Sequence, residues 1–254
     1  TTVIVPESLQ KMGTANMFSK NIEKVEVSPN NKYFSTENNC LYNKDKTELI
    51  MCFSKETTVE LANTVKKVNS FSFKQATNLT NVNLPDSVES ISNQVFTDCK
   101  KLENINIGEK VNSIDPLFKY RNYSGTVTID ENNPNYTVEG NVLYNKDKTE
   151  IIAVLYEIKG NFIVNTNVTK IGSRAFHNQN QMTEIKLPNN LLEISDSFNY
   201  CDGLTTIYIP ASVKTISTGC FSNATNLVQI QIEKEPGSIT GSPWGAIRGD
   251  RIVE

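Results

Sequence analysis

The stretch LTNVNLPDSVESISNQVFTDCKK (residues 79–101) decides the fold, because the sequence that follows it, LENINIGEKVNSIDPLFKYRN (102–122), repeats its pattern. The same pattern returns as MTEIKLPNNLLEISDSFNYCDG (182–203) and LTTIYIPASVKTISTGCFSNATN (204–226). Successive copies begin 22 or 23 residues apart (102 − 79, 204 − 182, 227 − 204). A repeat of this length is typical of a solenoid, in which each coil buries its apolar face against its neighbours.

Each apolar position of the shared pattern L-x-x-I-x-L-P-x-x-V-x-x-I-x-x-x-x-F-x-x-C has a place in a stacked coil. Val82 and Leu84 are two residues apart, so both side chains point to one face of a short strand. The proline after the strand lacks an N–H and ends the ladder. Val88 and Ile91 return to the same core from the far side. A phenylalanine then fills the wide end of the coil, in a segment predicted to form a short helical or 3-10 turn. These phenylalanines are Phe96, Phe118, Phe176, Phe198 and Phe221.

The apolar pairs predict ten coils and one domain. The coils start at Val3, Val25, Val59, Val82, Ile105, Val127, Phe162, Ile185, Ile207 and Ile230. The period and its Leu/Ile positions indicate a leucine-rich repeat. The predicted fold class is α/β and β-rich: a curved, right-handed solenoid with a parallel β-ladder, short helical turns and two inserted β-hairpins. It spans residues 1–246, and residues 247–254 form a C-terminal tail.

A longer duplication is superimposed on the short period. LYNKDKTELI (41–50) and LYNKDKTEII (143–152) agree at nine of ten positions, at an offset of 102 residues (143 − 41). Each lies in an insertion that lengthens one coil, and we expect a β-hairpin whose strands flank the polar turn N-K-D-K-T. We interpret the near-identity of these exposed tips as recent duplication rather than as a binding site.

Composition excludes several classes of partner. The net charge is −3 and the pI is about 5.4, which gives no electrostatic reason to expect nucleic acid or an anionic membrane. No apolar stretch approaches the roughly 18 residues that span a bilayer. The chain opens on the strand-like sequence TTVIVP, as a trimmed mature chain would, so the absence of a signal peptide carries no weight on secretion.

The cysteines follow the repeat rather than a metal-binding spacing. There are five. Cys99 and Cys201 are equivalent positions, and Cys40 and Cys52 fall where the second copy has valines. We expect all five to be small buried hydrophobic residues. A Cys40–Cys52 bridge across the hairpin is the alternative, which one choice of turn length allows.

The pattern as a whole resembles the BspA-like leucine-rich repeats. IGSRAF (171–176) and LPDSVESI (84–91) are the most typical stretches, and NVLYNKDKTEII (141–152) is similar to the longer repeat form of that family. GSITGSPWGA (237–246) is similar to the segment that closes such arrays in bacterial cell-surface proteins. The resemblance implies a secreted or surface-displayed protein that binds host proteins or other cells.

The residues that face solvent along the ladder are the candidates for recognition. In the two halves of the chain they are Lys24/Glu26, Thr58/Glu60, Asn81/Asn83, Asn104/Asn106, Thr126/Thr128, Asn161/Ile163, Glu184/Lys186, Thr206/Tyr208 and Gln229/Gln231. The stripe is polar and rich in amides. Interfaces usually need an aromatic or arginine anchor, which favours Tyr208. The predicted ligand-binding residues are Tyr208, Glu184, Lys186, Asn83 and Asn106.

The residue inventory argues against catalysis. Glycoside hydrolysis needs two carboxylates facing each other roughly 5–10 Å apart. Glu184 has no acidic residue in the adjacent coils, and Glu26 and Glu60 are one coil apart with Lys24 alongside. His177 is the single histidine and cannot form a zinc site alone. We therefore expect no catalytic residue, no metal and no cofactor.

Two features near the C-terminus have competing interpretations. Arg248-Gly249-Asp250 resembles an adhesion tripeptide and is a possible contact for another cell. Trp244 is either an exposed ligand contact or a cap on the open end of the last coil, and we favour the cap.

Together these observations predict a non-catalytic, monomeric binding or adhesion module outside the cell. Its partner would be a host or matrix protein or a glycan, with no nucleic acid and no membrane insertion within this segment. A structural spacer that presents other domains is one alternative. A secreted carbohydrate-active enzyme is another, from a different class.

Overall fold

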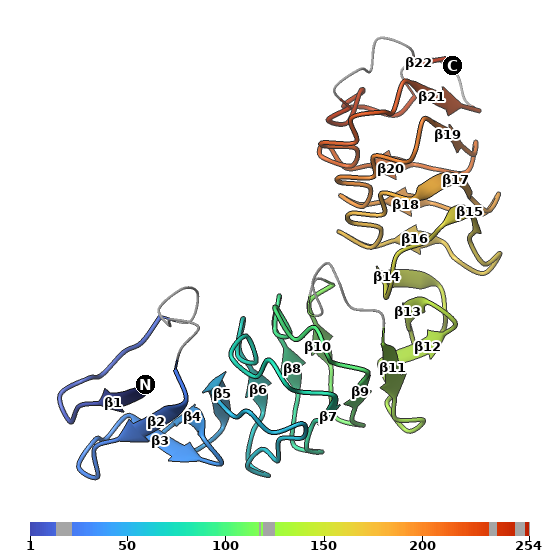
Figure 1. Cartoon of the computed structure of the whole chain (residues 1–254). Coiled ribbons are helices and arrows are strands. Elements are labelled where there is room, and N and C mark those ends of the chain that lie inside the picture. The colour runs from blue at the N-terminus through green and yellow to red at the C-terminus, as the bar shows by residue number, and fades with distance from the viewer. Residues whose placement is uncertain (14–21, 117, 119–124, 234–237, 247–251, 254) are drawn as a thin grey trace. The chain divides into compact units, whose positions relative to one another are not determined.

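The computed structural model describes residues 1–13, 22–116, 118, 125–233, 238–246 and 252–253 (Figure 1). The chain divides into two compact units, Thr1–Tyr136 and Thr137–Glu254. Each unit contains stacked coils with a parallel ladder of short strands, a second sheet and one inserted hairpin module. We describe the units one at a time.

The ladder of the first unit stacks the apolar pair of each coil on that of the next. Val82 pairs with Ile105, and Ile105 pairs with Val127, in parallel register. At the coil expected to start at Val59, the described residues show a single bridged pair, Thr58 with Asn81. The ladder strands are β1 (Thr2–Val5), β2 (Lys24–Val27), β7 (Asn81–Asn83), β9 (Asn104–Ile107) and β11 (Thr126–Ile129).

The V-x-x-I step of each coil builds the second sheet of the first unit. Ile91 pairs in parallel with Val68 and with Ile114, and Leu49 of the inserted hairpin continues the same row beside Val68. The insertion therefore extends this sheet. In spatial order its strands are β10 (Ser113–Ile114), β8 (Ser90–Ile91), β6 (Lys67–Val68), β5 (Glu48–Cys52), β4 (Cys40–Asn43) and β3 (Phe34–Glu37).

The second unit repeats this plan. Phe162 pairs with Ile185, and Ile207 pairs with Ile230. Its ladder strands are β15 (Gly160–Ile163), β17 (Met182–Lys186), β19 (Thr206–Ile209), β21 (Gln229–Ile232) and β22 (Ile252–Val253). The other sheet consists of β12 (Tyr136–Glu139), β13 (Val142–Asn145), β14 (Glu150–Val154), β16 (Lys170–Ile171), β18 (Glu193–Ile194) and β20 (Thr215–Ile216).

The predicted leucine-rich-repeat solenoid is confirmed, with about 9 turns in place of ten. The strand that does not form is the one expected at Val59. The turn between β3 and β4 supplies hydrogen bonds near that position, because Asn39 bonds to Glu23 and to Val25 of β2, and Asn38 bonds to the carbonyl of Glu60.

Stacked phenylalanines fill the core of each unit, as the sequence predicts. The rings of Phe73 and Phe96 are stacked with centroids 5.2 Å apart. In the second unit Phe176 and Phe198 lie 5.1 Å apart, and Phe198 and Phe221 lie 5.7 Å apart. All five rings are buried. Offset stacking adds about 0.5–1.5 kcal/mol per pair to the gain from burial.

The prediction of short helical turns, and with it the α/β class, is wrong for the described part of the chain. Those ranges contain strands, turns and bends but no helical residue. Left-handed residues flank the buried phenylalanines: Gln94 and Asp98 have φ of 52° and 64°, and Arg174 and Asn178 have φ of 60° and 66°. A positive φ interrupts a right-handed helix, so each segment stops at one hydrogen-bonded turn.

Among the described residues there is no helix long and apolar enough to cross a bilayer.

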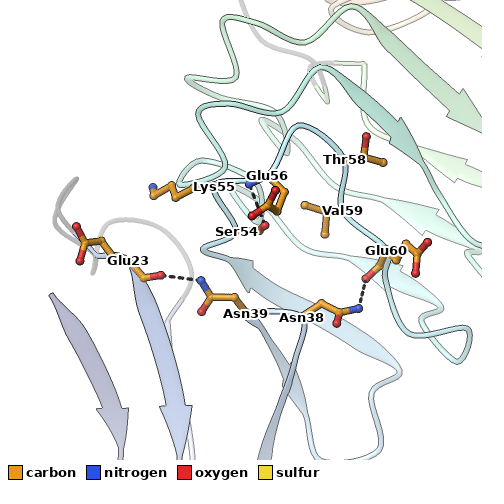
Figure 2. A pocket seen from close by; sticks show the side chains of 9 residues that line it. All are labelled: Glu23, Asn38, Asn39, Ser54, Lys55, Glu56, Thr58, Val59 and Glu60. Carbon is orange, nitrogen blue, oxygen red and sulfur yellow. Dashed lines mark hydrogen bonds between the residues drawn. The ribbon is translucent and has the colours of Figure 1, made fainter.

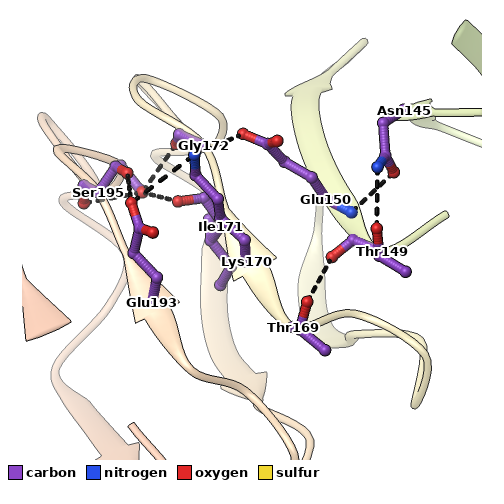
Figure 3. Close-up of polar contacts among 10 residues, drawn as sticks. Asn145, Thr149, Glu150, Thr169, Lys170, Ile171, Gly172, Glu193 and Ser195 are labelled. Atoms are coloured by element: carbon purple, nitrogen blue, oxygen red, sulfur yellow. Dashed lines mark hydrogen bonds and ion pairs between the residues drawn. The ribbon is translucent and has the colours of Figure 1, made fainter. Parts of the chain in front are cut away.

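Both predicted hairpins form, and the repeated N-K-D-K-T sequence has a structural role in them. The amide of Asn145 donates to the hydroxyl of Thr149 at 2.8 Å and accepts the N–H of Glu150 at 2.8 Å (Figure 3). Asn43 makes the same two bonds in the first copy, at 2.8 and 2.9 Å. The asparagine side chain at the start of each turn therefore bonds to both residues at its end.

A lysine in each tip completes the motif. Lys46 and Lys148 have φ of 53° and 55°, the left-handed conformation that the tight turn requires. Lys46 forms an ion pair with Glu37, and Lys148 forms one with Glu139 at 2.6 Å. The near-identity of the two tips thus reflects turn chemistry as well as duplication.

The expectation that all cysteines are unpaired is wrong for one pair. Cys40 and Cys52 lie directly opposite each other on β4 and β5 and form a disulfide. The hairpin register produces this pairing, and the same register places Val142 opposite Val154 in the second copy. The remaining cysteines are free and buried, as expected: Cys99, Cys201 and Cys220.

Trp244 is a cap, as predicted. Its side chain is 1% exposed and packs against the core of the second unit. The indole N–H donates to the carbonyl of Thr240 at 2.8 Å, and the backbone carbonyl of Trp244 accepts the N–H of Phe221 at 3.0 Å. A buried indole with its N–H satisfied closes the coil that ends at Phe221.

Candidate binding surfaces on the ladder

The ladder face of the first unit carries two rows of hydrogen-bonded amides. Asn106 donates to the carbonyl oxygen of Asn83 at 2.5 Å, and the hydroxyl of Thr128 donates to Asn106 at 2.6 Å. In the other row Asn104 donates to Asn81 at 2.7 Å. The structure therefore brings the predicted residues Asn83 and Asn106 together. Their side chains bind each other along the stack, which stabilises the ladder and occupies groups that a ligand would otherwise use.

The ladder face of the second unit is different, because bulky side chains stand on it. Ile163 is 72% exposed and lies beside Lys186 in the register of β15 and β17. Tyr208 is 45% exposed and lies beside Gln231 on β21. Glu184 is also exposed and lies opposite Asn161. The predicted residues Glu184, Lys186 and Tyr208 thus share one face of this unit, with Tyr208 one coil further on.

Tyr208 is held by an acidic neighbour. Partial desolvation, together with a hydrogen bond to Glu233 and the charge of that carboxylate, raises the pKa of Tyr208 above its usual value. The carboxylate of Glu233 also accepts the N–H of Ala211 at 3.4 Å. The phenol therefore donates its proton to a carboxylate that a backbone N–H also contacts.

The edge at Thr58 is the feature that sequence analysis missed. A groove opens there in the first unit, and Figure 2 shows the residues that line it. Glu56, Thr58 and Glu60 are all exposed. The regular I-x-L spacing predicts an ordinary ladder strand at this coil. The insertion that separates the strand pairs at Val25 and Val59 by 34 residues (59 − 25) is not a signal by itself, because an insertion of similar length precedes the complete strand β15 (162 − 127 = 35).

Charged residues on the other sheet form a small network. Lys170 lies between Glu150 and Glu193, at 3.3 and 3.7 Å from their carboxylates (Figure 3). All three side chains are partly exposed. Ion pairs of this kind contribute about 0–1 kcal/mol each, so the network is a solvated surface feature.

The described residues contain no group of three or more His, Cys, Asp or Glu side chains that could hold a metal ion. His177 packs edge-on against Tyr200, with ring centroids 5.4 Å apart. The tripeptide Arg248-Gly249-Asp250 lies outside the described residues.

Solved structures with the same fold are bacterial leucine-rich-repeat proteins. A leucine-rich repeat protein from Eubacterium ventriosum is 25% identical, with a TM-score of 0.54 over 87% of this chain and 58% of its own. This chain thus spans little more than half the length of that protein. A leucine rich cell surface protein from Faecalibacterium prausnitzii is 19% identical, with a TM-score of 0.56 over 100% of this chain and 78% of its own.

The pneumococcal vaccine antigen PcpA has the same fold at 16% identity. Its TM-score is 0.54, over 91% of this chain and 62% of the antigen. No curated protein matches the chain. The model of the BspA type leucine rich repeat region matches residues 50–159 and 155–243, in 6 copies. These ranges cover most of the ladder, and the chain therefore belongs to the BspA-type leucine-rich-repeat family.

Proposed function

We propose that this chain is a non-catalytic binding module that acts outside the cell as a monomer and contacts a protein or a glycan through the ladder face of its second unit. The observation that carries the proposal is the exposure of Ile163, which lies beside Lys186, and of Tyr208, one coil further along the chain. Exposed aromatic and aliphatic side chains on a rigid sheet are what a recognition site uses as anchors.

The extracellular location has two supports. The Cys40–Cys52 disulfide belongs to an oxidising compartment, since cytosolic thiols are kept reduced. Two proteins of the same fold are a cell surface protein and a vaccine antigen by name. Both lines favour display at a surface or release from the cell.

The non-catalytic role is supported by the surroundings of the ladder carboxylates. Glu184 lies opposite Asn161, an amide, in the neighbouring strand. Hydrolysis of a glycosidic bond needs a second carboxyl group across the substrate. An amide partner suits hydrogen bonding to a ligand instead.

The test begins with arrays of glycans and extracellular-matrix proteins probed with the intact chain. We expect a ligand whose affinity falls by more than about 1 kcal/mol, roughly fivefold, when Tyr208→Ala removes the anchor. Tyr33→Ala is the matched control, because Tyr33 is 44% exposed but belongs to the first unit and not to the proposed site.

Three results would overturn parts of the proposal. A ligand that binds Tyr208→Ala with unchanged affinity removes Tyr208 from the site. If no ligand binds on the arrays, the alternative of a structural spacer is favoured, and the amide rows of the first unit, which hydrogen-bond to each other, would suit that role. Release of sugar fragments from any polysaccharide would refute the non-catalytic role in favour of the enzyme.

A further inference from the structure

The groove at Thr58 has the size and the lining of a site for a short extended segment. Its volume is about 490 Å³, and its walls come from Glu23, which precedes β2, from the β3–β4 turn and from the segment that follows β5 (Figure 2). Most of its lining residues are polar, and among them Glu56, Thr58 and Glu60 are exposed.

Two asparagines of the β3–β4 turn, Asn38 and Asn39, keep the groove open. Asn39 accepts the N–H of Val25 at 3.0 Å and donates to the carbonyl of Glu23 at 2.7 Å. Its amide therefore takes the place that a strand would take beside β2. Asn38 turns the other way and donates to the carbonyl of Glu60 at 3.0 Å. Figure 2 shows these two amides on opposite sides of the turn.

The backbone of Thr58 is left with an unused edge. Thr58 bridges to Asn81, whose N–H donates to the carbonyl of Thr57. In a parallel pair one of the two facing residues directs both its N–H and its C=O to the other strand, and here that residue is Asn81. The N–H and C=O of Thr58 consequently point away from β7. Within the described residues neither group forms a hydrogen bond.

The charge beside this edge is negative and unpaired. Glu56 and Glu60 lie two residues before and after Thr58, and all three line the groove, with a bend at residues 56 and 57 leading into the bridge at Thr58. Neither carboxylate has an ion-pair partner within the part of the chain that the structure describes. The amine of Lys55 is turned to the carbonyl of Gln75, at 2.7 Å.

We propose that this groove binds an extended peptide segment that pairs its backbone with Thr58 and sets basic side chains against Glu56 and Glu60. Strand addition of this kind takes its affinity from main-chain hydrogen bonds and its specificity from alternate side chains. A partner with Lys or Arg two residues either side of the paired position matches the Glu-x-Thr-x-Glu edge. The site rests on the proposed role as a binding module, but it uses a different unit and different residues from the Tyr208 face.

The second copy of the duplication shows that the acidic edge is specific to the first. At an offset of 103 residues, Glu56, Thr58 and Glu60 are replaced by Lys159, Asn161 and Ile163. There the strand is complete, since β15 pairs with β17 along its length. The coil without a regular strand is therefore the one that carries the two glutamates.

The probe is the acetylated and amidated peptide Arg-Thr-Thr-Thr-Arg, titrated into the 15N-labelled full chain at low salt. We expect its binding to shift the amide signals of Thr58 and Glu60. Glu56→Gln and Glu60→Gln should each weaken binding about two- to fivefold, the range for one cross-strand charge pair. Lys159→Gln, at the equivalent position of the other copy, should leave it unchanged.

Three further arms separate the parts of the proposal. A peptide methylated at the amides of its third and fourth residues should bind at least tenfold more weakly; equal binding would overturn strand addition. Glu-Thr-Thr-Thr-Glu should not bind, and binding of equal strength would overturn the charge argument. Concentration-dependent self-association that is abolished by Glu60→Gln would assign the groove to a second copy of the chain and refute the peptide.

The outcome is independent of the Tyr208 tests. Loss of peptide binding with an intact Tyr208-dependent ligand would refute the groove alone. Peptide binding together with no ligand on the glycan and protein arrays would refute only the proposed site on the ladder face of the second unit.

Discussion

The two inserted hairpin modules descend from one sequence, and they differ at one pair of facing residues in the strands. In the first, Cys40 and Cys52 close the strand pair covalently; in the second, Val142 and Val154 occupy the same facing positions. In both, the turn asparagine, the left-handed lysine and the lysine–glutamate pair are retained. Positions fixed by backbone geometry stayed the same after duplication, whereas a buried contact changed from a covalent bond to packing.

The outer tips of the modules teach a second lesson. The first has two left-handed residues, Asn38 and Asn39, and the second has Gly140 with φ of 57° followed by Asn141. Asn141 exchanges two hydrogen bonds with the backbone of Tyr156, at 2.6 and 2.7 Å. Asn39 bonds to Val25 and Glu23 of the ladder and also to Phe53, which follows its own hairpin. The amide of the first module thus links its hairpin to the ladder.

The largest expected effect on stability comes from the core. Phe176→Ala should lower the free energy of unfolding by about 3–5 kcal/mol, the usual cost of a large cavity. Phe73→Ala should cost about 1 kcal/mol less, because Phe176 contacts both Phe162 and Phe198, while Val59 stands where Phe162 does. Urea denaturation measures both. A loss below 1 kcal/mol for Phe176→Ala would mean that the coil register is wrong.

The covalent difference comes next. Replacing Cys40 and Cys52 with alanine opens a bridge across a sequence separation of 12 residues and should cost about 3 kcal/mol by chain entropy. Hydrogen exchange should become faster in β4 and β5 and stay unchanged in β13 and β14.

Replacing the same two cysteines with valine is the control, since it copies the solution of the second module. It should recover part of the loss through packing. Equal stability of the alanine and valine variants would show that the facing pair is not a packing contact.

The turn asparagines should differ by a smaller amount. Asn39→Gly keeps the left-handed turn and removes the hydrogen bonds to Val25, Glu23 and Phe53, at an expected cost of about 2 kcal/mol. Asn141→Gly removes the two exposed bonds to Tyr156 and should cost about 1 kcal/mol.

Asn39→Asp tests the assignment of donor and acceptor. The carboxylate keeps the bond from the N–H of Val25 but cannot donate to a carbonyl. Its unfolding midpoint in urea should fall between those of the parent chain and Asn39→Gly. A midpoint equal to that of the parent would contradict the role of the amide as a strand substitute.

The smallest effect concerns the surface charges. Lys170→Met should cost less than about 1 kcal/mol, because its two glutamates are partly exposed. Lys67, the equivalent residue of the first copy, faces Glu48 and Ser90 in register, so Lys67→Met should cost less still. Both effects should shrink in 1 M salt, where the charges are screened. A loss that persists at high salt would point to packing of the lysine stem.

The repeat pattern predicts the parts of the fold that depend on side-chain periodicity. The stacked pairs of Val82 and Ile105, the phenylalanine core and both hairpins follow from spacing alone. The missing strand at Val59 does not, because it results from where the Asn38–Asn39 tip lies after folding. The prediction of helical turns was wrong, because the positions of apolar residues do not indicate which residues, such as Asp98, adopt a left-handed conformation.

The candidate site divides in the same way. Exposure of Tyr208, Glu184 and Lys186 follows from the alternation of the strand, and the structure agrees. The partner of Tyr208, Glu233, follows β21 in the next coil and is found only by the register. The acidic edge at Thr58 was missed for the same physical reason: an unpaired peptide group leaves no mark on the sequence.

The buried thiols give each unit a reporter of its own opening. Burial raises the pKa values of Cys99, in the first unit, and of Cys201 and Cys220, in the second, to about 12. At pH 8 these groups are protonated and shielded, so an alkylating reagent reaches them when their unit opens. Mass spectrometry of the alkylated peptides then times the two halves separately. The alkylation rates of the native cysteines therefore show which unit opens first, and no engineered probe is needed.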